Sequence, residues 1–483
     1  MPLILSGNVA SALPTGYEVA NSCRFDDGDS AYMHKTPGSA GNRKTWTFSC
    51  WVKRGGITGV NQHIIQMFPA GTGYTRIFFE DDESLSCDGT DSSAGNAFDL
   101  STNRLFRDVS AWYHICVAMD TTQGTASNRL KIYVNGTQET SFSTETYPGE
   151  NIDYQINHSE QLNIGRHNGG SSYFDGYMAE VVLIDGSALA PTSFGEFDED
   201  SPTIWKPKDV SGLTFGTNGF YLDFEDSANL GNDANGGTDF TEVNLAATDQ
   251  ATDTPTNNFA TMNPLNNPNG SYSEGNNSVW NSGQWRGFTS SIGMTTGKWY
   301  AEFKITGTNV QNGVFFGVGC GEAVETKNLE TANTGYLSYR ATGFERQAWS
   351  NNKVTNNTAT SGYGTAMAEN NIGMIAFDAT NGTIWTGVNG TWDNSATSSE
   401  IAAGTTTNAM FKRSDSPGVI AETYFFGCSI EGTSVTGLVN WNFGNPPYAI
   451  SSGNADANGY GNMEYSIPSG YYTLCTKNLA EFG

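Results

Sequence analysis

The sequence lacks any long hydrophobic run: no stretch approaches the ~18 consecutive apolar residues that span a bilayer. The opening segment MPLILSGNVASALPTG has no basic region, and its apolar run is too short for a signal peptide. We therefore expect no membrane insertion and no secretion directed by this segment. Instead, we expect residues 1–15 to form an arm in which Leu3, Ile4 and Leu5 dock on a partner.

Basic residues are also scarce. The chain has 24 Lys and Arg against 50 Asp and Glu, which gives a formal net charge of −26. A surface with this balance repels phosphate backbones, so we expect no binding of nucleic acid. The same balance is compatible with divalent cations or neutral glycans as ligands.

The usual signatures of catalytic and zinc sites are missing. None of the seven cysteines forms a CxxC pair, which excludes zinc-ribbon and thioredoxin-like sites. GxSxG, HExxH and GxxxxGK[ST] motifs are absent as well. The nearest candidate for a glycosidase acid pair is Glu196-Phe197-Asp198-Glu199-Asp200, which lies in a turn-rich setting and not in a central strand. We therefore expect that the protein is not an enzyme and requires no cofactor.

All five histidines lie in the first half of the chain. His114 alternates with Trp112 and Cys116, which places the three side chains on one face of a strand. We expect His114 to be a packed core residue and not a catalytic base.

Turn formers and aromatic residues are what the chain has in abundance. It contains 57 Gly, 21 Tyr, 27 Phe and 11 Trp. This composition is typical of an all-β protein with material for two cores. We predict two tandem antiparallel β-sandwich (jelly-roll) domains joined by an Asn/Asp/Thr-rich linker. The expected domains are residues 16–226 and 270–450, with the linker at 227–269 and a C-terminal extension at 451–483.

Local patterns in the first half predict individual strands. Trp46, Phe48, Cys50 and Val52 alternate with more polar residues, which is the period of a strand with one buried face. The pair Asn135-Gly136 after an apolar run predicts a type I′ hairpin turn.

A ladder of motifs runs through the second half: GKWYAEF at 297–303, GVFFGVG at 313–319, IGMIAFDATNGTIWTGVNG at 372–390 and VNWNFGNPPY at 439–448. In this order the pieces resemble the SPRY domain. The resemblance implies a β-sandwich that binds ligands through its loops and has no catalytic centre.

The first half resembles the concanavalin A-like sandwich of laminin-G and pentraxin-type domains. The resemblance is carried by WTFSCWVK, WYHICVAM, KIYVNG and FDGYMAEVVLID, in that order. Pentraxin-type domains often join two neighbouring strands by a disulfide at positions matching Cys50 and Cys116. The resemblance thus implies that these cysteines lie within bridging distance, oxidised or reduced according to compartment.

The same resemblance implies calcium as an optional ligand. Loop carboxylates suit this hard cation, and two acidic turns offer them: Asp26, Asp27 and Asp29 in one, and Asp81, Asp82 and Glu83 in the other. Turns capped by Asx side chains explain both clusters equally well.

For ligand contact in the second half, we select aromatic residues that lie near Gly, Asn and Ser, outside the clearest strands. Tyr336 with Trp349 is the preferred pair, and Tyr339, Trp392 and Trp285 are further candidates. The alternative for each is that it caps the sandwich core. Phe315 lies within a strand run and is expected in the core.

The whole arrangement is similar to one found in tailed, particularly marine, bacteriophages, through segments such as NGFYLDFEDSANLGND and DTPTNNFATMNPL. This resemblance implies a virion surface protein, assembled in the host cytoplasm and displayed on the tail or capsid. We expect a tail-fibre or receptor-binding role, with host surface glycan or another virion protein as partner. A decoration protein without a receptor role is the alternative, and a polysaccharide depolymerase is a third. A homotrimer is expected only by analogy with fibre-like relatives.

Overall fold

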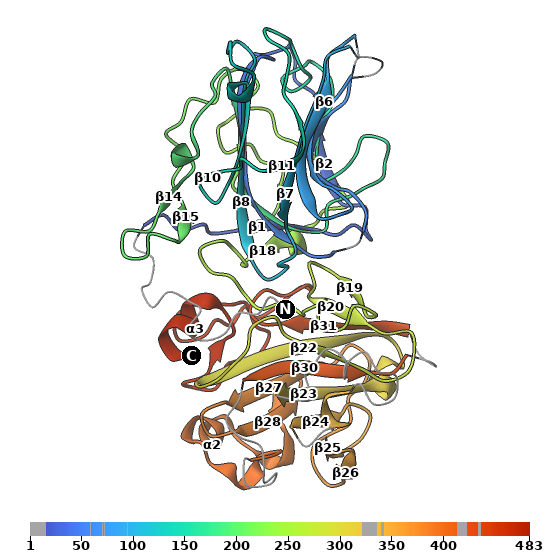
Figure 1. Cartoon of the computed structure of the whole chain (residues 1–483). Coiled ribbons are helices and arrows are strands. Elements are labelled where there is room, and N and C mark those ends of the chain that lie inside the picture. Colours follow the sequence, from blue (N-terminus) through green and yellow to red (C-terminus); the bar gives the residue numbers. More distant parts are fainter. Residues whose placement is uncertain are drawn as a thin grey trace. The chain divides into compact units, whose positions relative to one another are not determined.

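The fold is all-β, with antiparallel sheets that form tandem sandwiches, as predicted (Figure 1). The chain divides into two compact units, which we call the N-terminal unit (Pro14–Thr256) and the C-terminal unit (Asn257–Gly483). Among the helices that can be described, none is long and apolar enough to cross a membrane. The computed structural model describes residues 16–57, 59–69, 71, 73–93, 95–320, 336–339, 342–412, 423–432 and 436–483.

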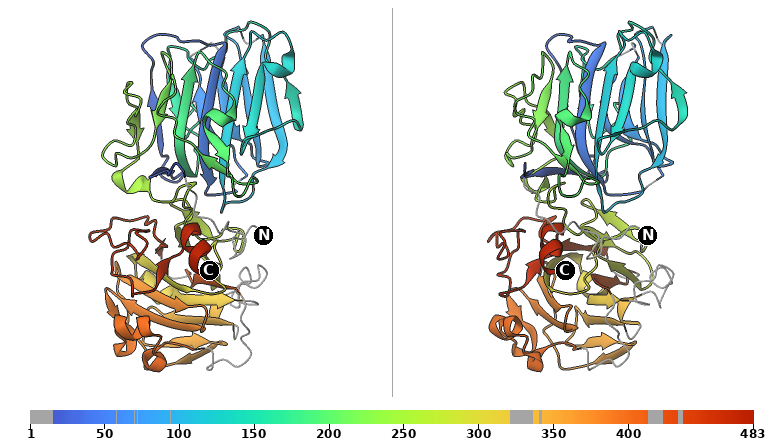
Figure 2. Two further views of the ribbon diagram at one scale, coloured as in Figure 1. Left: turned by 90° about the vertical axis from the view of Figure 1, so that its left-hand side faces the viewer. Right: turned by 60° about the vertical axis from the view of Figure 1, so that its left-hand side comes forward.

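Two antiparallel sheets form the N-terminal unit (Figure 2). The first sheet has the order β10 (Thr137–Gln138), β9 (Leu130–Val134), β8 (Trp112–Asp120), β3 (Thr45–Arg54), β13 (Gly176–Asp185), β1 (Ser22–Phe25) and β18 (Gln250–Ala251), and β16 (Phe220–Leu222) pairs with β13. The second has the order β11 (Phe142–Thr146), β7 (Ala97–Leu105), β6 (Ser84–Thr90), β5 (Thr75–Phe79), β4 (Gln62–Met67), β12 (Leu162–Ile164), β2 (Tyr32–Lys35) and β17 (Thr241–Val243). A separate hairpin joins β14 (Gly195–Phe197) to β15 (Trp205–Pro207).

Two sheets also form the C-terminal unit. One has the order β19 (Ser271–Ser273), β20 (Ser278–Trp280), β31 (Thr436–Asn442), β22 (Lys298–Thr308), β27 (Ile372–Asp378), β28 (Thr383–Val388) and β29 (Thr391–Trp392), and β32 (Tyr472–Thr473) pairs in parallel with β22. The other has the order β21 (Arg286–Thr289), β30 (Tyr424–Ile430), β23 (Val314–Cys320), β24 (Gly343–Gln347), β25 (Lys353–Thr355) and β26 (Thr358–Thr360).

Helical segments are short. The α-helices are α2 (Ser398–Ala403) and α3 (Thr476–Phe482), and the 3-10 turns are η1 (Ala126–Asn128), η2 (Pro191–Ser193), η3 (Ala247–Asp249), η4 (Val310–Gly313), η6 (Leu337–Tyr339), η7 (Asp393–Ser395) and η8 (Thr406–Asn408).

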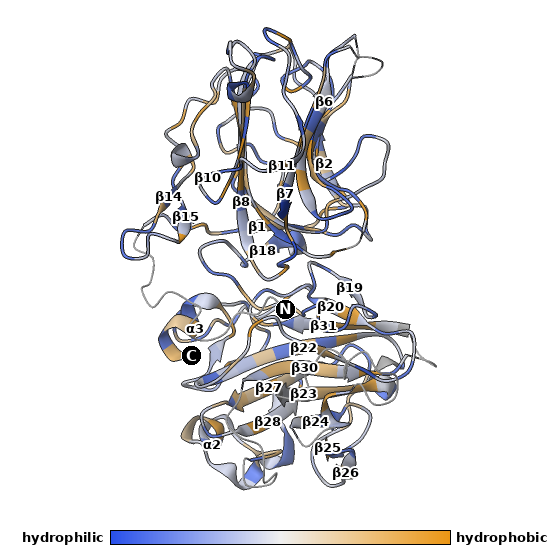
Figure 3. Cartoon of the chain, viewed as in Figure 1, coloured by the Kyte–Doolittle hydropathy of each residue, from blue (hydrophilic) through white to orange (hydrophobic). Residues whose placement is uncertain are grey.

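The alternation predicted for the first half is confirmed in β3. Trp46, Phe48, Cys50 and Val52 all belong to the core between the two sheets. Strands in both units carry many of the hydrophobic residues coloured orange in Figure 3. The hairpin prediction also holds: β9 and β10 pair directly, and the two turn residues Asn135-Gly136 have positive φ values of 47° and 75°.

His114 packs on the opposite face of the first sheet, as predicted. The Trp205 indole N–H donates to its Nδ1 at 3.0 Å. The ring's remaining proton therefore lies on Nε2, which contacts the Ser49 hydroxyl at 2.8 Å. Complete burial lowers the pKa of His114 to about 3, so the ring is neutral and structural.

The expected proximity of Cys50 and Cys116 does not produce a bridge. Both are buried free thiols. In the register, Cys50 faces Ile115 and Ser49 faces Cys116, so the two cysteines occupy successive positions that point to opposite faces of the sheet. Cys50 lies in the core between the sheets, whereas Cys116 packs with Val182 and Phe194 on the outer face.

The segment predicted as a linker, residues 227–269, is built into both units instead. β17 and β18 extend the two sheets of the N-terminal unit. Asp253 is fully buried, and its carboxylate accepts from Lys53 Nζ at 2.6 Å and from the Trp112 indole at 3.0 Å. Beyond Thr256, Ala260 N–H donates to the Leu474 carbonyl within the C-terminal unit. The composition misleads here because Asp233 and Asp253 are buried and paired with lysines, although Asp239 stays exposed.

The C-terminal extension packs on the C-terminal unit through a buried carboxylate. Glu302 on β22 accepts from the backbone N–H groups of Glu464 and Tyr465, each at 2.9 Å, and from the Tyr300 hydroxyl at 2.7 Å. Burial raises the pKa of Glu302 to about 7.

The pairing of β3 with β8 predicts that Cys50 and Cys116 stay reduced thiols. When the purified chain is unfolded without reductant and alkylated, peptides carrying Cys50 and Cys116 should both be modified, because no bridge can form across the sheet. Mass spectrometry of the digest measures this. A peptide pair linked through Cys50 and Cys116 in natively folded protein would contradict the register.

Candidate functional site

Several glycines lie on the outer face of one sheet of the C-terminal unit, the sheet that contains β23, β24 and β30. Gly317 on β23 lies between Gly427 on β30 and Glu345 on β24. A Cβ at position 427 would lie 2.8 Å from Leu337 Cδ1, and one at Gly343 would lie 1.8 Å from the Leu337 carbonyl oxygen. Glycine at these positions therefore lets η6 lie directly on the sheet.

Glu345 fixes η6 on this face of the sheet. Its carboxylate accepts from the Ser338 backbone N–H at 2.7 Å and from the Ser429 hydroxyl at 2.6 Å. The Ser429 oxygen in turn accepts from the Leu337 N–H at 2.9 Å. Burial raises the pKa of Glu345 to about 7. These bonds hold a segment that carries tyrosines at each end.

Half-exposed aromatic rings gather beside η6. Phe315 on β23 lies at the centre: Trp285 stacks on it at a centroid distance of 4.3 Å and Trp349 stacks at 5.2 Å. Tyr336 meets Phe315 edge-on at 5.9 Å, and Tyr339 meets Tyr336 edge-on at 5.3 Å. We call Trp285, Phe315, Tyr336 and Trp349 the aromatic cluster.

The cluster is held by polar contacts as well as by stacking. The Tyr336 hydroxyl donates to the Asn357 side-chain oxygen. Trp285, Tyr336 and Trp349 each keep part of their surface exposed. Flat rings with exposed faces and no charge of their own suit the apolar faces of sugar rings or an uncharged protein surface.

Sequence reasoning selected Trp285, Tyr336, Tyr339 and Trp349, and the structure brings these four together. Phe315 was expected in the core and is missing from that selection. Its strand neighbours Val314, Phe316 and Val318 do face the core, so alternation turns Phe315 outward. It is 7% exposed because the rings of the cluster cover it.

Trp392 does not belong to the cluster. It is 6% exposed and packs in a separate group with Tyr300 and Ile401. Its indole N–H donates to the Ser398 hydroxyl at 3.1 Å. Because this ring fills space under α2, it offers no surface for a ligand.

The two acidic turns use their side chains locally. Asp26 accepts from the Gly28 N–H at 2.7 Å, and Asp82 accepts from the Ser84 N–H at 2.9 Å. Glu83 turns inward and pairs with Arg54. Within the part of the chain that the structure describes, no three His, Cys, Asp or Glu residues are grouped to hold a metal ion. Calcium binding at Asp26, Asp27 and Asp29 or at Asp81, Asp82 and Glu83 stays a prediction.

The N-terminal arm expected to dock on a partner, with Leu3, Ile4 and Leu5, lies outside the described residues.

A polar row that sequence reasoning missed crosses the outer face of the second sheet in the N-terminal unit. Gln66, Arg76, Asp88 and Asp99 lie side by side on four adjacent strands. The Arg76 guanidinium donates to both oxygens of Asp88, at 2.6 and 2.8 Å, and lies over the Phe78 ring. Both Asp88 oxygens are thus held in a forked ion pair with Arg76. A glycosidase instead needs two carboxyl groups that face the substrate, one as acid and one as base or nucleophile.

Two carboxylates of the acidic run Glu196–Asp200 also form ion pairs. Lys206 pairs with Glu196 at 3.7 Å and with Asp198 at 3.3 Å across the β14–β15 hairpin. The two carboxylates lie on a separate exposed hairpin and not on a central strand.

Part of the chain matches a known family. Residues 26–192 match a family model described as the concanavalin A-like lectin/glucanases superfamily, so this part is a laminin-G-like, concanavalin A-like domain. No curated protein matches the sequence.

Three solved structures are similar to parts of the chain at low identity. The SPRY domain of human HERC1 has 17% identity and a TM-score of 0.26, over 34% of this chain and 87% of that one. A native heptameric SAP-like pentraxin from Limulus polyphemus has 16% identity and a TM-score of 0.25, over 37% and 76%. Domain 4 of AbnA, a GH43 extracellular arabinanase from Geobacillus stearothermophilus in complex with arabinotriose, has 17% identity and a TM-score of 0.25, over 31% and 65%.

The buried Glu345 carboxyl predicts a pH-dependent stability. Its pKa is about 7 in the folded chain, above the ordinary value of 4.5, so the folded state holds this proton more tightly than the unfolded state. Its stabilising contribution is therefore complete below pH 4.5 and is lost as the pH rises through about 7. The neutral variant Glu345→Gln should lose less stability than the wild type between about pH 5 and pH 7.5, by about 2 kcal/mol.

Denaturant unfolding followed by tryptophan fluorescence measures this difference. Glu369→Gln, at an exposed position of the same unit, is the matched control and should follow the wild type. An unchanged pH dependence in Glu345→Gln would show that this carboxyl is not buried in the way described.

Proposed function

We propose that the protein is a non-enzymatic recognition protein and that the aromatic cluster binds neutral glycan on a host cell surface. The observation that carries the proposal is the grouping of Trp285, Tyr336 and Trp349, each partly exposed, around Phe315 on β23. Rings that are already stacked lose little conformational freedom when a ligand binds, so their contact area contributes more of its free energy to affinity.

The charge of the chain supports a neutral ligand. A net charge of −26 repels acidic polysaccharides and phosphate groups at long range. A neutral sugar ring is insensitive to this field and can stack on an indole face. The forked pairing of Arg76 with Asp88, and of Lys206 with Glu196 and Asp198, supports a role in binding and not in hydrolysis.

The proposed setting is a bacteriophage virion, on which the chain acts as a tail-fibre or receptor-binding component. Support comes from the resemblance of the whole arrangement to virion proteins of tailed phages. In this setting Leu3, Ile4 and Leu5 contact another virion protein, and a homotrimer displays several aromatic clusters at once. Multiple copies raise the overall avidity for a repeated surface glycan.

A glycan array with the full chain tests the proposal. The wild type should bind neutral glycans saturably, and Trp349→Ala should weaken binding about tenfold, because it removes one stacked ring from the contact. Phe197→Ala, which removes an exposed ring from the N-terminal unit, is the matched control and should leave binding unchanged.

Other outcomes of the array would change or reject the proposal. Binding that is equal in the wild type and Trp349→Ala would place the contact elsewhere. Absence of glycan binding would reject the proposal in favour of a decoration role, and release of shorter saccharides would establish hydrolysis. Repeating the array with EDTA tests whether calcium takes part.

A further inference from the structure

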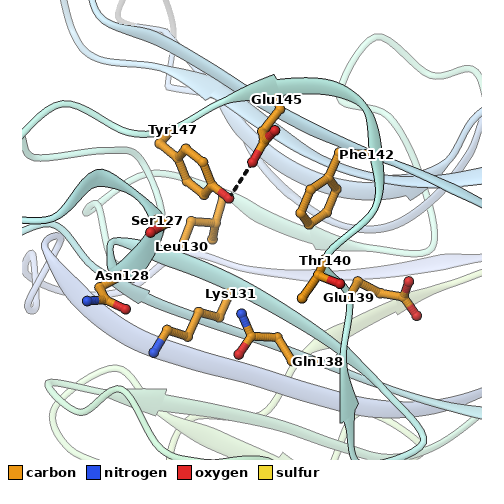
Figure 4. Close-up of a pocket in the computed structure, with 10 residues that line it drawn as sticks. All are labelled: Ser127, Asn128, Leu130, Lys131, Gln138, Glu139, Thr140, Phe142, Glu145 and Tyr147. Carbon is orange, nitrogen blue, oxygen red and sulfur yellow. Dashed lines mark hydrogen bonds between the residues drawn. The ribbon is translucent and has the colours of Figure 1, made fainter.

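The N-terminal unit has a cleft of about 340 Å³ at one side of its sandwich (Figure 4). β9 and β10 end the first sheet on this side, and β11 ends the second. Residues of β9, β10 and β11 line the cleft, together with Glu139 and Thr140 between β10 and β11. Its volume is in the range of small-molecule sites, and it is separate from the aromatic cluster, which lies in the other unit.

A carboxylate lies at the end of a core row, beside the cleft. Ile65, Ile77, Cys87 and Leu100 pair in sequence across the second sheet and face the core. The next position in the same row is Glu145 on β11. Glu145 is exposed at this end of the row, where a carboxylate keeps its contact with water.

One wall of the cleft combines this carboxylate with two rings. Phe142 and Tyr147 pack against the core with one part of each ring and line the cleft as well. The Tyr147 hydroxyl donates to Glu145 Oε1 at 2.9 Å, as the dashed line in Figure 4 shows. Within the described residues the second oxygen of Glu145 has no hydrogen-bond partner, so it is available as an acceptor.

Hydrogen-bonding groups line the opposite side. Figure 4 shows Lys131 and Gln138 across from Tyr147, with Asn128 beside them. Lys131 forms no ion pair with any residue that the structure describes, so its ammonium group is available as a donor. The amides of Asn128 and Gln138 can both donate and accept.

We propose that this cleft binds one sugar residue of a neutral glycan. A sugar ring presents hydroxyl groups that donate to Glu145 and accept from Lys131, and an apolar face that stacks on Tyr147. The other carboxylate of the cleft, Glu139, is paired with Arg104 at 2.7 Å. With Glu145 unpaired in a chain of net charge −26, an acidic sugar is disfavoured. The site is independent of the aromatic cluster, so the chain carries a recognition site in each unit.

Saturation-transfer NMR and calorimetry with the full chain test the inference. The probes are glucose, galactose, mannose, N-acetylglucosamine, xylose and arabinose, with glucuronic acid as the charged comparison. At least one neutral sugar should bind, and Glu145→Ala should weaken its binding about tenfold or more, because it removes the acceptor without disturbing a buried group. Tyr147→Phe keeps the ring and removes its hydroxyl, and should cause a smaller loss.

Thr144→Ala is the matched control. Thr144 precedes Glu145 on β11 and pairs with Ser101, so its side chain points away from the core row. Binding should be unchanged in Thr144→Ala, and glucuronic acid should bind more weakly than glucose.

Three results would overturn the inference. The first is that no neutral sugar of the panel binds. The second is that binding survives in Glu145→Ala. The third is that sugar binding is lost in Trp349→Ala and kept in Glu145→Ala, which would assign all recognition to the aromatic cluster and leave the proposed function intact.

Discussion

The hydrogen bond from the Ser338 backbone to the Glu345 carboxylate determines where the candidate site can exist. η6 is too short to be stable by itself, so it needs an anchor on the sheet. Glycines at positions 343 and 427 let it approach, and the buried carboxylate fixes its backbone. Tyr336 then stands beside Phe315, where Trp285 and Trp349 complete the cluster.

Buried carboxylates hold irregular segments elsewhere in the chain as well. Glu302 holds the backbone of the C-terminal extension, and Asp253 joins Lys53 to Trp112 in the N-terminal unit. A buried carboxylate is costly unless hydrogen bonds or a cation compensate it. Here each such group ties an irregular segment to a sheet, which is why a chain rich in loops still presents fixed side chains to a ligand.

Local signals predicted much of the fold. The alternation at Trp46–Val52 and the Asn135-Gly136 turn depend on neighbours in sequence, so they could be read directly. The same alternation places Phe315 on the outer face, whereas the apolar character of the whole run predicts a core strand. The meeting of Arg76 with Asp88, or of Glu345 with Ser338, depends on strand pairing that composition does not reveal. The linker prediction failed for a related reason, since composition alone does not show that Asp253 has buried partners.

The central claim is that the aromatic cluster is the surface that meets a ligand. Hydrogen exchange of the full chain, alone and saturated with a neutral glycan selected on the array, tests it most directly. We predict slower exchange on binding at residues 336–339 and 343–349, which adjoin the cluster rings. Exchange that is unchanged there while another part of the chain becomes protected would contradict it.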